Sequence, residues 1–373
     1  MLLALVGKTN VGKSTFFSAA TMIDVEISNR IFTTIKPNIG TVYVRFPCPC
    51  SSLGVKCNPH NSKCENGIRL IPFQLMDIAG LVPGAHLGKG LGNQFLDEIR
   101  QAHALIHILD AAGATNENGE QVAPGTRNPV DDVIFLEQEI DLWIQSLIDK
   151  AIKKGKDEKG IVEQLSGLSV NPEIIKKAIE TVGFSPRLAK EIRRLSKPMV
   201  IAANRMDLPH AEENLKALKE KFPDHIFIPT CAEAELALRR ANRAGIVKYT
   251  PGASDFEILN ANEQQERALQ SIKSLLKKYG STGVQECIDR AVFDLLKMVV
   301  VYPVEDENKY CNRQGAVLPD AFLLKKGSTA LDLAYAIHTD IGKKFICAVD
   351  ARTKKRLAKD YELKSGDIIR IVV

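Results

Sequence analysis

The sequence lacks the features that would place it in a specialised class of protein. Its 373 residues contain no apolar run near the eighteen residues that span a membrane, no low-complexity tract and no internal repeat. The 45% apolar and 25% charged content is that of an ordinary soluble globular protein. Because the chain is too long for one ordinary domain, we expect two to four domains and no association with a membrane.

Dense cysteines and a targeting segment are also absent. Eight cysteines are few for this length, and Cys231, Cys287, Cys311 and Cys347 are scattered singly, which favours reduced, buried thiols over disulfides. The apolar stretch 1–6 is too short for a signal peptide and has no basic flank, so we interpret it as a buried first strand. We therefore expect a cytoplasmic protein.

The net charge of +5 is small but unevenly distributed. Between Lys150 and Lys197 there are twelve Lys or Arg against six Asp or Glu, and the run 352–359 holds five cations and no acid. Two such patches favour a nucleic acid as partner, because neutralising phosphates releases counterions. An ordinary solvated face explains either patch equally well when it is taken alone.

Short apolar runs that end in polar residues predict a mainly parallel sheet. Helical segments alternate with these runs, which indicates a doubly wound α/β domain with its ligands at the carboxyl ends of the strands. The predicted strands are 2–6, 40–46, 69–76, 104–110, 198–204 and 226–229.

Three other regions have different patterns. Apolar residues recur at helical spacing from Pro129 to about Lys154 and shorter helical pieces follow, which predicts a helical insertion. The last 75 or so residues combine short strands with one helix over 329–340, which predicts a small α+β domain. The predicted organisation is an α/β domain at 1–128 and 196–248, the insertion at 129–195, a helical connecting segment at 249–297 and the α+β domain at 298–373.

The stretch GKTNVGKS matches the Walker A pattern and stands between a predicted strand and a predicted helix. The loop N–H groups and the positive end of such a helix hold phosphates. Lys13 contacts the β and γ phosphates and the Ser14 hydroxyl binds Mg²⁺. The predicted phosphate-binding residues are Gly7, Lys8, Thr9, Asn10, Val11, Gly12, Lys13, Ser14 and Thr15.

A second motif, DIAG, follows the strand at 69–76. Asp77 can hold the Mg²⁺, and the Gly80 N–H can meet the γ phosphate. A DxxG sequence is common by chance, but its place after a Walker A motif and at a strand end makes it informative.

Base recognition is predicted at NRMD, after the strand at 198–204. The Asp207 carboxylate can accept two hydrogen bonds from guanine, a pattern that adenine cannot supply, so the motif of Asn204, Arg205 and Asp207 favours GTP over ATP. Arg205 replaces the usual lysine and keeps a cation and a long stem to pack over the purine. Near Cys231 and Ala232, after the next strand, a backbone N–H can contact guanine O6.

The four motifs in this order indicate a TRAFAC-type GTPase. The stretches FTTIKPN and DIAGLVPGAHLGKGLGNQFL resemble the Obg superfamily, and specifically its YchF branch; LPDAFLLKKGSTALDLAYAIHTDIGKKF and DARTKKR resemble the TGS domain that ends this branch. The resemblance implies a P-loop GTPase domain and a β-grasp, ubiquitin-like TGS domain. It also implies a Mg²⁺-dependent switch that hydrolyses GTP to GDP and contacts rRNA or tRNA on the ribosome, with no DNA sequence specificity.

The resemblance also assigns catalytic roles. It implies that Thr34 closes on Mg²⁺ when the γ phosphate is present, with Thr33 as the alternative. Leu81 stands where Ras-like enzymes carry the glutamine that orients the attacking water. The intrinsic rate of hydrolysis should therefore be low, and another group must orient the water. The candidates are Asn10, which in some relatives with this P-loop pattern helps to bind K⁺, the loop residue His86, and a partner.

Two other functions remain open. Most YchF-like proteins have a degenerate base-recognition motif and are associated with ATP, whereas this chain retains Asp207, so an ATP-preferring hydrolase is one alternative. A non-enzymatic, nucleotide-gated RNA-binding or stress adaptor is the other.

Between the predicted strands at 40–46 and 69–76 lies a segment rich in thiols. Its four cysteines and one histidine could build a tetrahedral Zn²⁺ site, which would stabilise a short loop that has no core. The spacing CxC-x₆-C-x₂-H-x₃-C is not a familiar zinc pattern, and free thiols in a loop are the alternative. The candidate ligands are Cys48, Cys50, Cys57, His60 and Cys64.

Overall fold

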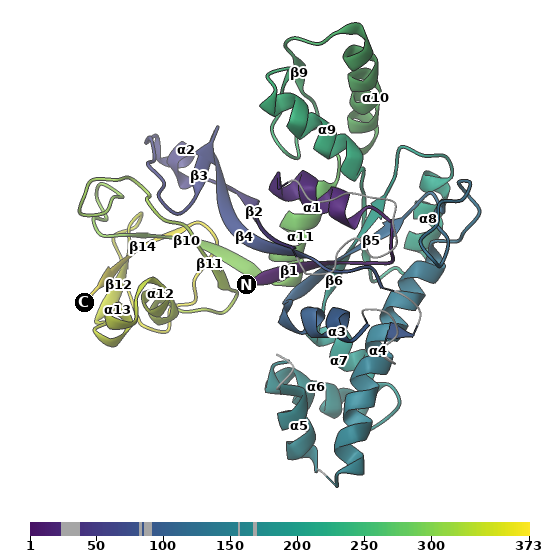
Figure 1. Ribbon diagram of the computed structural model, residues 1–373. Coiled ribbons are helices and arrows are strands. Elements are labelled where there is room, and N and C mark those ends of the chain that lie inside the picture. The colour runs from purple at the N-terminus through teal and green to yellow at the C-terminus, as the bar shows by residue number, and fades with distance from the viewer. Residues whose placement is uncertain (24–37, 82–83, 86–91, 156, 167–169) are drawn as a thin grey trace. The chain divides into compact units, whose positions relative to one another are not determined.

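A computed structural model describes residues 1–23, 38–81, 84–85, 92–155, 157–166 and 170–373 of the chain (Figure 1). These residues form two compact units. The first comprises 1–42 and 74–291, and the second comprises 43–73 and 292–373. No helix of the described part is both long and apolar enough to cross a membrane.

The first unit is built on a parallel sheet, as the alternating pattern predicts. Its strands β4, β1, β5, β6 and β7 pair in that order, each parallel to the next. Asp77 at the end of β4 pairs with Leu5, and Asp110 pairs with Asn204, so polar residues collect at the carboxyl ends of the strands. The strands are β1 (Leu2–Val6), β4 (Ile68–Asp77), β5 (Ala104–Asp110), β6 (Met199–Asn204) and β7 (Ile226–Pro229).

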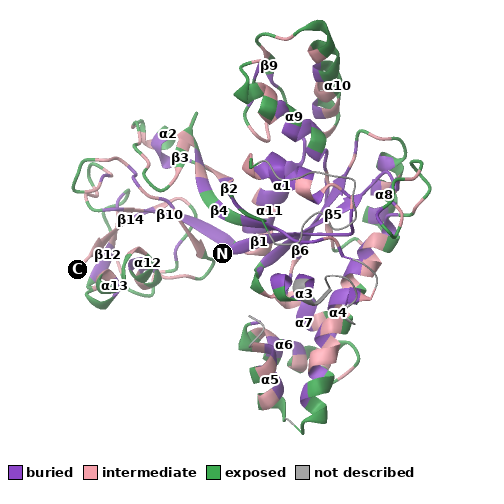
Figure 2. Cartoon of the chain, viewed as in Figure 1, coloured by how far each residue is buried: buried purple, intermediate pink, exposed green. Residues whose placement is uncertain are grey.

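Helices cover both faces of this sheet, and β1, β5 and β6 are buried along their whole length (Figure 2). Helix α1 packs against α9 and α11 on one face, and α3, α4 and α7 lie on the other (Figure 1). The predicted doubly wound α/β fold is therefore confirmed. These helices are α1 (Lys13–Thr21), α3 (Gly92–Gln101), α4 (Val130–Lys153), α7 (Leu188–Ser196), α9 (Ala232–Arg243) and α11 (Val284–Arg290); α8 (Ala211–Lys221) packs with the start of α4.

The insertion consists of α4, α5 (Glu158–Ser166), α6 (Pro172–Val182) and α7. Helix α4 has the bounds that its apolar spacing predicts and buries Leu136, Ile140 and Ile144 in the core below the sheet. Arg193 of α7, which sequence analysis counted in a basic patch, is buried instead. Its guanidinium binds Glu137 at 2.8 Å and Asp141 at 2.6 Å on α4.

The segment after α9 forms a small subdomain rather than a purely helical connection. A two-stranded sheet of β8 (Val247–Lys248) and β9 (Glu257–Ile258) precedes α10 (Glu263–Tyr279). Asn262 caps α10, and Gly280 ends it with a φ of 82°. Glu235 is fully buried beneath this subdomain, where it accepts hydrogen bonds from Tyr249, Arg239 and Thr282.

The second unit contains a five-stranded sheet in the order β11, β10, β14, β12, β13. The central strands β10 and β14 are parallel, their neighbours are antiparallel, and α12 packs on one face, which is the β-grasp arrangement predicted for this region. The elements are β10 (Met298–Val304), β11 (Phe322–Lys325), α12 (Ala330–Ile337), α13 (Thr339–Lys343), β12 (Cys347–Asp350), β13 (Arg356–Leu357) and β14 (Asp367–Val372).

Two details of the second unit differ from expectation. The helix predicted over 329–340 is divided at His338, whose extended backbone begins α13 and whose Nδ1 accepts from the Asp340 N–H. The cysteine segment, which sequence analysis included in the α/β domain, belongs to the second unit. It lies between β2 (Asn38–Pro47) and β4 and contains α2 (Pro49–Leu53) and β3 (Lys63–Glu65).

Candidate functional site

The phosphate-binding loop connects β1 to α1 and requires glycine at two positions. Gly7 and Gly12 have φ angles of 143° and 101°, which side chains rarely adopt. A Cβ at Gly7 would lie 2.3 Å from the Ile108 carbonyl oxygen, and one at Gly12 would lie 2.4 Å from Asn204 Nδ2. The loop therefore lies so close to β5 and β6 that neither glycine leaves room for a side chain.

Lys13, Ser14 and Asp77 meet at the start of α1. Lys13 Nζ donates to the Lys8 carbonyl at 2.7 Å. Burial lowers the pKa of Lys13 to about 8, although the Asp77 carboxylate opposes this shift. Burial also raises the pKa of Asp77, against the favourable effect of Lys13 and Ser14 on its charged form. Burial therefore disfavours the charged forms of both Lys13 and Asp77 when no ligand is bound.

This group fits a Mg²⁺ ion. The Ser14 hydroxyl donates to Asp77 Oδ2 at 2.8 Å, so two hard oxygen ligands are already adjacent. The other carboxylate oxygen, Oδ1, is buried and has no hydrogen-bond partner among the described residues. A buried carboxylate oxygen without a donor is where a water bound to the metal would be held.

The segment that follows Asp77 lies against the phosphate-binding loop. A Cβ at Gly80 would lie 2.4 Å from Thr9 Cγ2, and the Leu81 N–H donates to the Gly7 carbonyl at 3.1 Å. The Leu81 side chain is 1% exposed and packs in the core with Leu96 and Ile99. Leu81 therefore faces the interior rather than the phosphates. The predicted switch residues Thr33 and Thr34 and the candidate His86 lie outside the described residues.

Asn204 and Arg205 connect the base-recognition motif to the phosphate-binding loop. Asn204 Nδ2 donates to the Val11 carbonyl at 2.9 Å. Arg205, which adopts a φ of 64°, binds the Asn10 carbonyl at 2.7 Å and Asp110 Oδ2 at 2.8 Å. Its guanidinium is therefore held by the protein at the edge of the phosphate-binding loop.

A pocket of about 490 Å³ lies between these motifs. Asp207 is exposed at its lining and accepts a hydrogen bond from the Cys231 thiol at 3.2 Å. The N–H groups of Cys231 and Ala232, from which a contact to guanine O6 was predicted, already donate to Thr282 and to Asn204 Oδ1. The lining residues are Gly12, Thr15, Ala114, Gln121, Val122, Pro124, Asn204, Arg205, Asp207, Leu208, Cys231 and Glu233.

Sequence analysis missed the loop that follows β5. Asp110 is 1% exposed and accepts from the Ala112 and Ala114 N–H groups and the Thr115 hydroxyl, which shapes one wall of the pocket. Farther along this loop, the Gly119 carbonyl accepts from Asn10 Nδ2 at 2.7 Å. A buried strand that ends in aspartate was a signal for Asp110, whereas nothing in the sequence linked 115–121 to the phosphate-binding loop.

Helix α4 of the insertion contacts the site in two places. Lys8 Nζ binds Asp132 at 2.8 Å, and the side chains are 4% and 12% exposed. Burial raises the pKa of Asp132 to about 6, although Lys8 opposes the shift. Two turns later, Glu139 accepts a hydrogen bond from the Gly84 N–H, which follows the DIAG motif. The insertion is thus bound to both phosphate-sensing segments.

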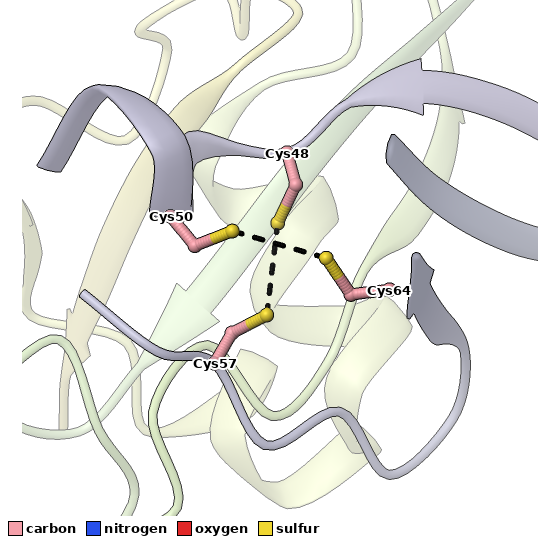
Figure 3. Close-up of side chains that lie close together, drawn as sticks. All are labelled: Cys48, Cys50, Cys57 and Cys64. Atoms are coloured by element: carbon pink, nitrogen blue, oxygen red, sulfur yellow. Dashed lines mark hydrogen bonds between the residues drawn. The ribbon is translucent and has the colours of Figure 1, made fainter. Parts of the chain in front are cut away.

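The four thiols of the cysteine segment lie together in the second unit. The sulfurs of Cys48, Cys50, Cys57 and Cys64 are all within 4.8 Å of one another (Figure 3). His60, the fifth candidate ligand, is exposed and is not part of this group.

Comparison with known proteins shows which family the chain resembles. Three family models match the chain: "50S ribosome-binding GTPase" at 2–138, "Obg-like GTPase YGR210-like, G4 motif-containing domain" at 202–306, and "TGS domain" at 314–373. An uncharacterized GTP-binding protein of Methanocaldococcus jannaschii is 55% identical over 100% of this chain and 98% of its own.

The chain belongs to the Obg-like GTPases, in the YchF-related branch with a TGS domain.

Two further relatives support this placement. The crystal structure of a GTP-binding protein from Pyrococcus horikoshii OT3 is 41% identical, covers 100% of this chain and 99% of its own, and superposes with a TM-score of 0.78. The ribosome-binding ATPase YchF of Bacillus subtilis is 28% identical over 98% of this chain and 97% of its own. The match to this Obg-like GTPase thus extends over nearly the whole length of both relatives, one named for GTP and one for ATP.

We expect nucleotide binding to become weaker above pH 8. With a pKa of about 8, Lys13 is mostly neutral at pH 9, and bound phosphates favour its charged form, so binding must then take up a proton. The affinity for GTP should be about tenfold lower at pH 9 than at pH 7. Isothermal titration calorimetry in two buffers of different ionisation enthalpy would measure both the affinity and the proton uptake.

The control is Lys13→Arg, because its guanidinium stays charged throughout this range. An equal loss of affinity between pH 7 and pH 9 in this variant would contradict the role of the Lys13 pKa.

Proposed function

We propose that the protein is a Mg²⁺-dependent GTPase that hydrolyses GTP to GDP and phosphate with a low intrinsic rate. We also propose that it acts in the cytoplasm as a switch, with the ribosome and its rRNA or tRNA as partner. The observation that carries this proposal is the pocket that joins the Asp207 carboxylate to the phosphate-binding loop.

Base selection rests on Asp207. The carboxylate is exposed at the pocket and is the acceptor that guanine's N1–H and amino group require. The adjacent Asn204 and Arg205 side chains are fixed to the loop at Val11 and Asn10, so Asp207 keeps a defined distance from the phosphates. Glu233, also at the pocket, offers a second carboxylate but is not in the motif.

Phosphate chemistry rests on the start of α1 and the end of β4. Lys13 would transfer its hydrogen bond from the Lys8 carbonyl to the β and γ phosphates, which would stabilise its charged form. Ser14 and Asp77 would hold Mg²⁺, which when bound neutralises charge that develops on the phosphates. The Gly80 N–H, at the close approach to Thr9, would meet the γ phosphate.

The water that attacks the phosphate must be oriented without Leu81, since that side chain is buried in the core. Asn10 is bound through its amide nitrogen to the Gly119 carbonyl, which supports a role in holding the loop and fixes the orientation of its amide. Binding of K⁺ beside Asn10, an action of His86, and a group supplied by the partner remain the three candidates.

The basic surfaces are proposed as the RNA-binding regions. In the TGS domain, Lys355, Arg356 and Lys359 are exposed and make no ion pair within the described part of the chain. In the insertion, the exposed cations are Lys150, Lys153, Lys154, Lys159, Lys176, Lys177, Arg187, Lys190 and Arg194. Arg193 and Lys197 are excluded, because both are buried and bound to acceptors of the protein.

The substitution Asp207→Ala tests base selection. It should weaken GTP binding about 100-fold and leave ATP binding unchanged, because two hydrogen bonds to a charged acceptor are lost, at about 1.5 kcal/mol each or more. Titration with fluorescent GTP and ATP analogues measures both affinities. Glu233→Ala, which removes a carboxylate from the same pocket, should keep the preference for GTP. Tighter binding of ATP than of GTP by the unmodified protein would indicate an ATP-preferring hydrolase instead.

A comparison of K⁺ with Na⁺ at equal ionic strength tests how the water is activated. If K⁺ beside Asn10 supplies charge to the transition state, turnover should be about tenfold or more faster in K⁺. Asn10→Ala should abolish this difference while GDP still binds. If K⁺ has no effect and His86→Ala abolishes turnover, Asn10 loses its proposed role in activating the water. Absence of turnover even with K⁺ and ribosomes would favour the non-enzymatic adaptor.

The triple substitution of Lys355, Arg356 and Lys359 by Gln tests the TGS surface. Sedimentation with ribosomes over a series of salt concentrations should show weaker binding, with a salt slope reduced by about two to three, because each lost phosphate contact removes nearly one released counterion. The matched control neutralises Lys216, Lys219 and Lys221 on α8, which are also exposed. If the control weakens binding equally, the effect is one of net charge rather than of this surface.

A further inference from the structure

Four thiols converge on one point in the second unit, and none of them belongs to the residues that serve the nucleotide. Cys48 begins α2, Cys50 lies in its first turn, Cys57 is in the following loop and Cys64 is in β3. Figure 3 shows the four sulfurs directed toward a common centre, with the lines from Cys48 to Cys57 and from Cys50 to Cys64 crossing. Two pairs of nearly equal separation that cross in this view are compatible with the opposite edges of a tetrahedron.

The distances agree with a single metal ion. The sulfurs of Cys48 and Cys57 are 3.9 Å apart, and those of Cys50 and Cys64 are 3.8 Å apart. Four sulfurs at the usual Zn–S distance of about 2.3 Å in a tetrahedron are separated by about 3.8 Å. The protein therefore holds the thiols at the spacing of a tetrathiolate zinc centre.

Disulfides, an iron–sulfur cluster and unrelated thiols fit these distances less well. A disulfide requires sulfurs at about 2.05 Å, and each of these pairs is nearly twice as far apart. An iron–sulfur cluster binds its cysteines through several different irons, so the sulfurs must stand farther apart than around one ion. Four unrelated thiols have no reason to converge, since burial alone does not bring sulfurs to a common point.

The surroundings supply positive charge and donors for such a centre. Arg69 is fully buried and pairs with Cys64 across the β3–β4 ladder. Arg69 Nε and the buried Tyr302 hydroxyl have no partner among the described residues. Four thiolates and Zn²⁺ carry a net charge of −2, which this guanidinium partly balances.

We propose that Cys48, Cys50, Cys57 and Cys64 bind one structural Zn²⁺ that fastens this segment to the start of the TGS domain. Each thiol loses its proton to solvent on binding, and the coordination shell has no open position for substrate. His60 is not a ligand. The site is closed and takes no part in the nucleotide chemistry, so its role is to order the polypeptide around it.

The contacts of the segment show what the ion would stabilise. The Asn58 and His60 N–H groups donate to the Val317 and Pro319 carbonyls at 2.8 and 2.7 Å. Asn61 exchanges two hydrogen bonds with the backbone of Ala321. Arg69 Nη2 donates to the Leu318 carbonyl at 2.9 Å. Residues 317–321, which lead into β11, thus depend on a loop that has little core of its own.

Metal analysis of the full-length protein tests the site. Plasma mass spectrometry of protein purified under reducing conditions should find one zinc per chain, and Cys57→Ser or Cys64→Ser should lose it. Cys347→Ser is the matched control, because it removes a buried thiol of the same unit that lies outside the group, and it should keep the zinc. Protein without metal, iron in place of zinc, or full retention of zinc in Cys57→Ser would overturn the assignment.

Two measurements do not depend on the variants being folded. Unmodified protein stripped of zinc and loaded with Co²⁺ should show the thiolate-to-cobalt charge-transfer absorption of a tetrahedral site; its absence would overturn the proposal. Mass spectrometry after alkylation should find no disulfide between these cysteines, and finding one would also overturn it.

Hydrogen exchange tests the structural role. Removal of the zinc should speed exchange of the Asn58 and His60 amides about tenfold or more, while amides of the β-grasp strand β14 keep their protection. Unchanged exchange at Asn58 and His60 would show that the ion does not order this segment.

Discussion

The nucleotide site depends on one buried side-chain amide. Asn204 donates to the Val11 carbonyl and accepts from the Ala232 N–H, so a single residue at the end of β6 joins the phosphate-binding loop to the loop after β7. Because the side chain has little access to water, each of these groups left unpaired would cost about 1–3 kcal/mol. The same close approach requires glycine at position 12. The phosphate-binding loop and the predicted base-recognition motif are therefore held together as one rigid unit, which also fixes the position of Asp207.

Charges in the interior of the first unit link this construction to its surroundings. Arg205 binds Asp110, and Lys8 binds Asp132. Asp77 lies beside Lys13, and one of its oxygens has no partner among the described residues. Buried pairs of this kind contribute little net stability, but breaking one is costly, so they fix geometry. Through Asp132 and Glu139, helix α4 is bound to the phosphate-binding loop and to the segment after DIAG. A change in the position of either segment therefore acts directly on helix α4 of the insertion.

The second unit contains a long connection that its sheet does not hold in place. Strand β10 is central to its sheet yet precedes the region that matches the TGS family model, so the domain begins earlier than that match. A long connection, 305–321, separates β10 from β11, and its end is bound by the cysteine segment rather than by the sheet. Because this connection offers few apolar residues to a core, hydrogen bonds from the cysteine segment hold its end in place.

The sequence by itself determined most of the secondary-structure elements and the motifs at their ends. Apolar runs such as 104–110 and the glycines of GKTNVGKS are local signals, so the strands and the motifs at their ends could be predicted, and parallel pairing placed Asp77 and Asn204 at one edge. Only the tertiary structure decided the side-chain partners: that Arg193 is buried against Glu137, that Leu81 faces the core, that Ala232 donates to Asn204, and that four cysteines converge without His60. These outcomes depend on contacts between residues far apart in the chain, which spacing and periodicity do not encode.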